Sequence, residues 1–149
     1  MKKLYILFFL SSISAFSQNN LKELLQKHNT QSVAYISVES LKRLPKNIII
    51  LDAREKKEFS TSHLKGAEFV GYENFNLKKT IEKLPAKNAQ IVVYCSLGIR
   101  SEDVAEQLKK AGYPNVLNLY GGIFEWKNSN NKVYNSKEIA TEKVHVFSK

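Results

Sequence analysis

The sequence predicts an α/β fold, a single domain with a mostly parallel central sheet flanked by helices. Two apolar runs, residues 48–51 and 91–94, do not alternate with polar residues, which is typical of strands covered on both faces. Segments with apolar residues at helical spacing separate the expected strands along the chain. The length of 149 residues suits one domain that buries its own core without disulfides or a structural metal.

Residues 1–17 have the features of a secretory signal peptide. Two lysines follow Met1, an apolar run occupies residues 4–10, and small residues precede a cleavage site between Ser17 and Gln18. The apolar run is too short to span a bilayer as a helix. We therefore expect an exported chain, periplasmic or secreted, that is not stably inserted in a membrane after cleavage. The alternative is an N-terminal helix that is never cut and anchors the chain.

The rest of the chain divides into three parts. Residues 18–31 are polar with leucines at helical spacing, which predicts a short, loosely packed helix that leads into the domain. Residues 32–130 form the domain, and residues 131–149 are a polar C-terminal extension with 144–147 as an edge strand or a docked tail. Within the domain, strands are expected over 32–37, 47–53, 68–70, 91–94 and 116–119, and helices over 38–44, 56–60, 76–84, 101–111 and from Gly122.

Residue types define several helix limits. Pro45 and Pro85 each end a helix, because proline cannot continue one. Ser101 is a favourable N-cap for the clearest helix of the chain, and acidic residues suit its first turn. Gly112 supplies the stop of the same helix.

The chain is basic, with a formal net charge of +9 that falls to +7 if cleavage removes Lys2 and Lys3. A basic surface attracts small anions such as thiosulfate or polysulfide. The lysines are spread along the chain without an arginine-rich run, so nucleic acid is not an expected partner. Three scattered histidines and one cysteine give no metal-ligand spacing, so neither a metal nor a cofactor is expected.

The only cysteine, Cys95, follows the buried run 91–94 and precedes the helix expected from Ser101. Backbone N–H groups converge at the start of a helix, and their partial positive charge and the cation of Arg100 both favour thiolate over thiol. Sulfur nucleophile chemistry is one interpretation, and a small buried hydrophobic residue that closes a strand is the other. With no second cysteine, Cys95 has no partner for a disulfide within the chain.

Four segments, in order and spacing, resemble the motifs of the rhodanese homology domain over about residues 32–130. They are Ile50-Leu-Asp-Ala-Arg-Glu-Lys-Lys-Glu-Phe59, similar to D-x-R-x-x-x-E-F; His63-Leu-Lys-Gly-Ala67, similar to H-I-x-G-A; Val93-Tyr-Cys-Ser-Leu-Gly-Ile-Arg-Ser101, similar to C-x-x-G-x-R-S; and Leu119-Tyr-Gly-Gly-Ile-Phe-Glu-Trp126, similar to L-x-G-G-x-x-x-W. Ser62 replaces a glycine that is common before the histidine. Ser96 and Leu97 occupy positions where many thiosulfate-preferring members carry basic residues, so the resemblance leaves the sulfur donor open.

The resemblance implies a sulfurtransferase in which Cys95 is the catalytic residue. Cys95 would take a sulfane sulfur, become a persulfide, and pass the sulfur to a thiophilic acceptor such as cyanide, a thiol or a protein thiol. The loop would bind the small anionic sulfur donor through Ser96, Leu97, Gly98, Ile99, Arg100 and Ser101. A loop curled around sulfur directs several N–H groups to its centre, and glycine permits the tight backbone that this needs.

Charged residues at the start of the following helix have two possible effects. Arg100 would hold the anionic donor or the anionic sulfur, and its alternative role is a salt bridge to Glu102 or Asp103. The negative charge of both acids would raise the pKa of the Cys95 thiol and so disfavour the thiolate. We expect the backbone N–H groups to outweigh them if the acids point to solvent.

Asp52, Arg54 and His63 are expected to support the site. Asp52 and Arg54 form an Asp-x-Arg pair at a strand end, which predicts charge-assisted hydrogen bonds that tie loops together. The alternative is that this pair borders the Cys95 pocket and tunes its charge. His63 is expected to buttress a turn, with general acid–base chemistry as the alternative. Glu58 is expected to tether a loop.

Three other functions are alternatives to the enzyme. The first is a non-catalytic persulfide carrier or thiol sensor that docks a protein partner, and the second is a binding module with an inert cysteine. The third is a phosphatase of the same fold, which this chain also resembles. The phosphatase loop is one residue longer, and Ser101 stands where that loop has its arginine. The smaller loop suits one sulfur atom better than a tetrahedral phosphate.

Overall fold

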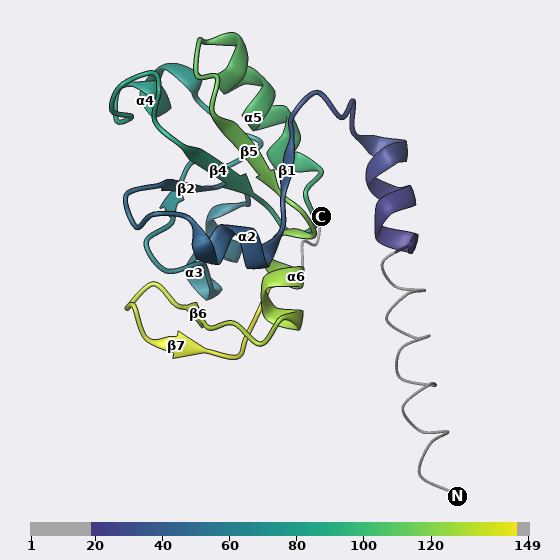
Figure 1. The fold of residues 1–149 in the computed structure, drawn as a ribbon. Coiled ribbons are helices and arrows are strands. Elements are labelled where there is room, and N and C mark those ends of the chain that lie inside the picture. Colours follow the sequence, from purple (N-terminus) through teal and green to yellow (C-terminus); the bar gives the residue numbers. More distant parts are fainter. Residues whose placement is uncertain (1–18, 146–149) are drawn as a thin grey trace, which may run out of the picture.

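The computed structural model describes residues 19–145. Five strands form a parallel sheet in the order β1-β5-β4-β2-β3 (Figure 1). The strands are β1 (Tyr35–Ile36), β2 (Ile49–Asp52), β3 (Glu68–Phe69), β4 (Ile91–Tyr94) and β5 (Val116–Leu119). The helices between and after them are α2 (Val38–Arg43), α3 (Lys56–Thr61), α4 (Leu77–Ile81), α5 (Arg100–Lys110) and α6 (Gly122–Asn128). The predicted α/β fold with a parallel sheet and flanking helices is confirmed.

The central strand β4 explains why its sequence lacks polar alternation. Its four residues are all buried. Ile91 and Val93 pack into an apolar cluster with residues of α5, whereas Val92 and Tyr94 pack into a second cluster with residues of α2 and α6. Successive side chains of a strand point to opposite faces, so a strand covered on both faces must be apolar throughout.

The candidate site lies at the carboxyl edge of the sheet. All neighbouring strands are parallel, so the ends of β2, β4 and β5 meet at one edge. Asp52 pairs in register with Tyr94, and Val93 pairs with Asn118. Ligand crevices of open α/β sheets form at this edge. Cys95 follows β4 directly and therefore lies between the loops after its two neighbouring strands.

The predicted role of Ser101 as a helix N-cap is wrong. The helix α5 begins one residue earlier, at Arg100, and its N-cap is Ile99, with no side-chain cap hydrogen bond. Ser101 is fully buried, and its hydroxyl lies 2.7 Å from Oδ1 of Asn118 on β5. The neighbouring strand provides a buried acceptor, so the hydroxyl is used for a tertiary contact instead of a cap.

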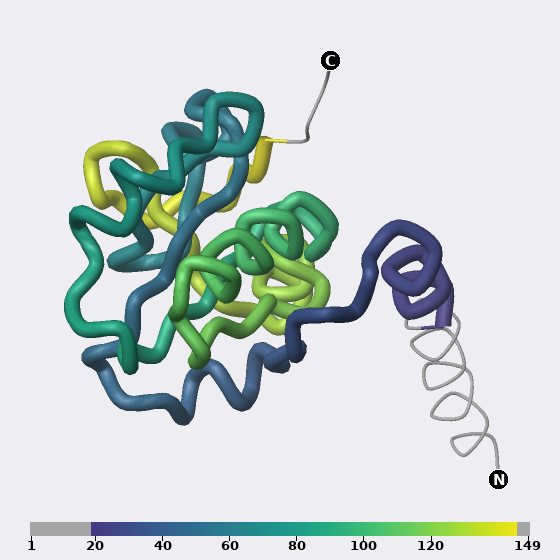
Figure 2. The backbone as a smooth tube through the Cα atoms, turned by 90° about the horizontal axis from the view of Figure 1, so that it is seen from above, coloured from purple at the N-terminus to yellow at the C-terminus, as the bar shows by residue number. Residues whose placement is uncertain are grey.

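The N-terminal segment is helical over residues 19–28, as expected, and most of its residues are exposed. Leu25 on this helix is only 2% exposed. In Figures 1 and 2 the purple helix lies beside the domain on the side of α5 and α6. No helix among the described residues is long and apolar enough to cross a membrane. The predicted signal peptide, residues 1–17, lies outside the described part of the chain.

The C-terminal extension contains a small antiparallel sheet that the sequence did not predict. It pairs β6 (Val133–Tyr134) with β7 (Ala140–Thr141) (Figure 1). The expected element over 144–147 is only partly described. Residues 144 and 145 are not in a strand, although Val144 packs against the second cluster. Residues 146–149 lie outside the described part.

Candidate active site

Cys95 is the first residue of a tight loop between β4 and α5, and its thiol is buried. The residue is 2% exposed, and its Sγ accepts a hydrogen bond of 3.1 Å from the backbone N–H of Gly98. Ser101 Oγ lies 3.4 Å from the same sulfur. Gly98 has a φ of +110°, a conformation that side chains rarely adopt. The loop thus turns back on the sulfur and directs the backbone N–H of Gly98 at it, whereas the sequence predicts several such donors.

The first residues of α6 hydrogen-bond to the backbone of this loop. The N–H of Ile123 donates to the carbonyl oxygen of Cys95 at 2.9 Å, and the N–H of Phe124 donates to that of Ser96 at 3.3 Å. Gly122 makes the approach possible, because a Cβ on this residue would lie 2.3 Å from the Cys95 oxygen. The second glycine of the Gly121-Gly122 pair is therefore required by close backbone contact with the cysteine.

Arg100 is held by Glu58 of α3. Its Nη1 and Nη2 donate to the two oxygens of Glu58 at 2.8 and 2.9 Å, and Nη2 also donates to Ser96 Oγ at 3.0 Å. The partner that the structure shows is therefore Glu58, which the sequence had not linked to Arg100. Both partners are shielded, with side chains 13% and 2% exposed for Arg100 and Glu58.

This pairing shifts both groups toward their charged forms. Burial alone would raise the pKa of Glu58, but hydrogen bonds from Arg100 and from the Glu55 backbone outweigh it and hold that pKa below its ordinary value. Burial would likewise lower the pKa of Arg100, but the hydrogen bonds to Glu58 outweigh it and raise that pKa. The guanidinium beside the loop is therefore a permanent cation whose charge is largely balanced by Glu58.

The two acids that follow Arg100 have different surroundings. Asp103 is exposed and accepts a 2.6 Å hydrogen bond from Tyr72, which, together with burial, raises the pKa of Tyr72 to about 12. Glu102 is only 1% exposed and accepts from the hydroxyl of Tyr35 at 3.1 Å. The condition that both acids point to solvent is therefore not met by Glu102, because the N-terminal segment covers it.

Asn118 is a site residue that sequence reasoning missed. It is fully buried on β5, its Nδ2 donates to the carbonyl oxygen of Gly98 at 2.8 Å, and its Oδ1 lies 2.7 Å from Ser101 Oγ. A hydroxyl carries one proton, so Ser101 donates either to Asn118 or to the Cys95 sulfur. The sequence did contain a signal, since Asn118 is a polar residue in a strand expected to be buried. A buried amide without hydrogen-bond partners destabilises the fold, so such a residue is expected to have specific partners.

Asp52 and Arg54 are fully buried and tie the end of β2 to neighbouring segments. Two nitrogens of Arg54 bind the Asp52 carboxylate, with the shortest distance 2.6 Å, and Arg54 Nη2 also donates to the Ser62 carbonyl oxygen. Tyr94 donates to Asp52 at 2.5 Å. Burial and the charge of Asp52 raise the pKa of Tyr94 well above its ordinary value. These hydrogen bonds match the loop-tying role predicted for the pair.

His63 lies in a different network from the Cys95 loop. Its ring nitrogens lie 3.0 Å from the Phe59 carbonyl oxygen and 2.9 Å from Glu138 Oε1, and its ring stacks on Phe59. Its backbone pairs with Tyr134 of β6. The residue therefore joins α3 to the C-terminal extension, which fits the predicted buttress.

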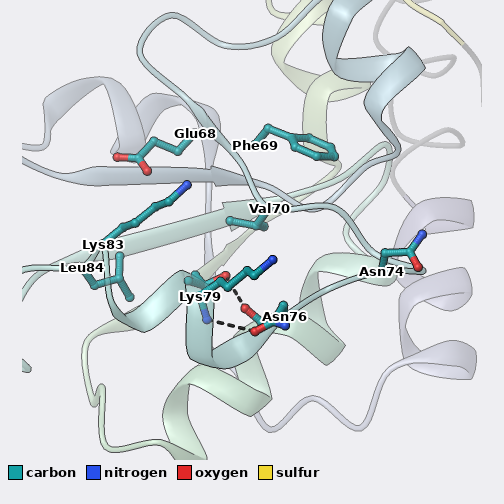
Figure 3. A pocket seen from close by; sticks show the side chains of 9 residues that line it. Glu68, Phe69, Val70, Asn74, Asn76, Lys79, Lys83 and Leu84 are labelled. Atoms are coloured by element: carbon teal, nitrogen blue, oxygen red, sulfur yellow. Dashed lines mark hydrogen bonds between the residues drawn. The ribbon is translucent and has the colours of Figure 1, made fainter.

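A separate hollow lies between β3 and α4. This pocket of about 230 Å³ is lined by nine residues, including Glu68, Asn76, Lys79 and Lys83 (Figure 3). Cys95 is not among them. Among the described residues, no group of three or more His, Cys, Asp or Glu side chains could hold a metal ion.

Comparison with known proteins finds one family over more than half of the chain. A family model described as Rhodanese-like domain matches residues 37–129. The probable adenylyltransferase/sulfurtransferase MoeZ of Mycobacterium tuberculosis is 31% identical over 81 residues, which cover 54% of this chain and 20% of that protein. A tRNA uridine(34) hydroxylase of Listeria monocytogenes is 39% identical over 85 residues, which cover 54% of this chain and 26% of that protein. The similarity thus spans only about a fifth to a quarter of these relatives.

Solved structures show the same fold. A thiosulfate sulfurtransferase from Pseudomonas aeruginosa aligns with a TM-score of 0.64 and 23% identity, over 79% of this chain and 22% of that one. A rhodanese-like domain from Anabaena sp. aligns with a TM-score of 0.61 and 22% identity, over 77% of this chain and 92% of that one.

Proposed function

Because this chain belongs to the rhodanese-like domain family, we propose that it is a sulfurtransferase that moves a sulfane sulfur from thiosulfate or polysulfide to a thiophilic acceptor through a persulfide on Cys95. The observation that carries this proposal is the position of Sγ, which accepts the Gly98 N–H at 3.1 Å inside the loop. Backbone donors of this kind stabilise an anionic sulfur. The sulfurtransferase named among the relatives supports the same chemistry.

The reaction consists of two displacements at sulfur. In the first, the Cys95 thiolate attacks the sulfane sulfur of the donor and a new S–S bond forms. The bond between that sulfur and the rest of the donor breaks, and sulfite or a shortened polysulfide leaves with the electron pair. In the second, a thiolate or cyanide attacks the terminal sulfur and Cys95 leaves as the thiolate.

The chain's own residues have distinct roles in these steps. The Gly98 N–H stabilises negative charge on sulfur, and the Ser101 hydroxyl can turn its proton from Asn118 to the sulfur when that charge develops. Arg100 places a fixed cation beside the loop. Leu97 and Ile99 are partly exposed and offer apolar surface at the loop.

A persulfide carrier or thiol-sensing module that docks a protein is the second candidate. It is favoured by the ion pair of Arg100 with Glu58, which leaves little net positive charge for a small dianion. Leu97 is apolar where a basic residue would attract such a donor, and this also weakens the binding of a small dianion. A carrier would hold the sulfur on Cys95 and deliver it only to its partner.

We also propose that the protein acts outside the cytoplasm, in the periplasm or after secretion. The support is the signal-peptide pattern of residues 1–17 with cleavage between Ser17 and Gln18.

Steady-state turnover with cyanide tests the proposal. Thiocyanate formation is measured with thiosulfate and, separately, with polysulfide, for the wild type and for Cys95→Ser. The enzyme proposal expects turnover with at least one donor and none in the variant. Persulfide loading without thiocyanate formation favours the carrier. A wild type that neither loads sulfur nor turns over contradicts both.

A further inference from the structure

The segment that precedes the family match contacts the Cys95 loop directly. Asn29 Nδ2 donates to the carbonyl oxygen of Gly98 at 2.8 Å, across 69 positions of sequence. Leu25, on the preceding helical turn, is 2% exposed, and its Cδ2 lies 3.6 Å from where a Cβ of Gly98 would be. Leu21 approaches Gly121 in the same way, at 3.3 Å. The helix of residues 19–28 therefore forms a wall of this loop.

The hydrogen bond from Asn29 acts on the residue with the most backbone freedom in the loop. The Gly98 carbonyl oxygen accepts two side-chain amides, from Asn29 and Asn118, both at 2.8 Å. The Gly98 N–H is directed at Cys95 Sγ. Both peptide groups of this glycine are thus fixed. In a trans peptide the C=O and N–H point in opposite directions, so the two amides also direct the Ile99 N–H away from themselves.

A buried carboxylate holds Asn29 in place. The same Nδ2 donates to Tyr35 Oη at 2.7 Å, and the Tyr35 hydroxyl donates to Glu102 Oε2 at 3.1 Å. Burial, partly offset by the bond from Asn29, raises the pKa of Tyr35 to about 12, so its hydroxyl stays protonated near neutral pH. The result is a chain of hydrogen bonds from Glu102 through Tyr35 and Asn29 to Gly98.

We propose that Asn29 is a positioning residue of this active site: it fixes the Gly98–Ile99 peptide and so keeps the donors of the loop directed at Cys95. The proposal rests on the proposed function in that the positioned loop is the one that accepts sulfur. It makes the N-terminal segment, which lies outside residues 37–129, a working part of the site.

The test compares Asn29→Leu, which keeps similar bulk without the donor, with Ser32→Ala as the matched control. Ser32 ties the same segment to Glu106 of α5 at 2.6 Å and does not touch the loop. Two rates are measured at fixed pH on the full chain, the alkylation of Cys95 by iodoacetamide and the gain of persulfide from polysulfide. Thermal midpoints are measured in parallel. Loss of one positioning hydrogen bond is expected to slow both reactions about 3- to 10-fold in Asn29→Leu, and Ser32→Ala is expected to match the wild type.

The proposal is overturned if Asn29→Leu reacts as fast as the wild type. It is also overturned if Ser32→Ala loses as much rate as Asn29→Leu. If Asn29→Leu does not fold, Tyr35→Phe, which removes the hydroxyl that Asn29 contacts, replaces it under the same criteria. The alkylation rate needs no sulfur transfer. A wild type that gains no persulfide would therefore defeat the proposed function, while alkylation would still decide the role of Asn29.

Discussion

Glu58 and Arg100 lie 42 positions apart in the sequence and form a two-pronged ion pair beside the Cys95 loop, with N–O distances of 2.8 and 2.9 Å. The pair joins α3 to the first turn of α5. Ser96 Oγ completes the cluster, accepting from Arg100 at 3.0 Å. The loop is therefore braced by side chains from outside it as well as by its own backbone.

Replacing Arg100 by lysine is expected to lower the free energy of unfolding by about 1–3 kcal/mol, measured by urea denaturation. An ammonium cannot make both hydrogen bonds to the buried Glu58. The matched control is Lys110→Ala, which removes an exposed pair with Glu106 at 3.7 Å and should change stability little. A similar loss of unfolding free energy in both variants would contradict a stabilising role for the Arg100–Glu58 pair.

Glu58 also predicts how stability depends on pH. Its native pKa lies below the ordinary value of 4.5 because Arg100 and the Glu55 backbone outweigh its burial. A carboxyl with a lowered native pKa stabilises the fold above its unfolded pKa, and this contribution is lost as pH falls through the native pKa. Thermal midpoints should therefore fall as pH drops below about 4.5, and fall less steeply in Glu58→Gln. The exposed Glu23→Gln should keep the wild-type slope, and a wild-type slope in Glu58→Gln would refute the assignment.

Alanine at Gly122 is expected to displace the loop, because its Cβ would lie 2.3 Å from the Cys95 carbonyl oxygen. We expect persulfide formation to slow at least about 10-fold, a change of roughly 1.4 kcal/mol in the barrier. Gly66→Ala is the matched control: this residue also has a positive φ, +74°, but nothing lies within 4 Å of its Cβ position. It shares the backbone strain without the clash, so equal slowing in both variants would show that strain alone is responsible.

Local sequence features predicted the strands and the loop well. Residues 91–94 are apolar without alternation because β4 is covered on both faces, and Cys95 follows where the parallel strands end. The four motifs placed the domain over about residues 32–130, and the family match covers 37–129. These features depend on residues that are close in the sequence, so a sequence pattern can predict them.

Partners that meet only in the folded chain were harder to predict. Arg100 was expected to hold the anionic donor or sulfur, with acids two and three positions away as the alternative partners, but the fold brings Glu58 of α3 to it. Ser101 was assigned a cap, but Asn118 of β5 takes its hydroxyl. The contact of Asn29 with Gly98 joins a polar lead-in to the loop and leaves no local pattern. Strands of two residues in a polar segment, such as β6 and β7, are too short to show periodicity.

The measurement that tests the central claim most directly is the mass of the purified protein after brief incubation with thiosulfate and, separately, with polysulfide. Cys95→Ala is the control. The account predicts a gain of one sulfur atom with at least one donor, lost when cyanide is added and absent in the variant. No added sulfur with either donor, or an equal gain in Cys95→Ala, would contradict a persulfide on Cys95.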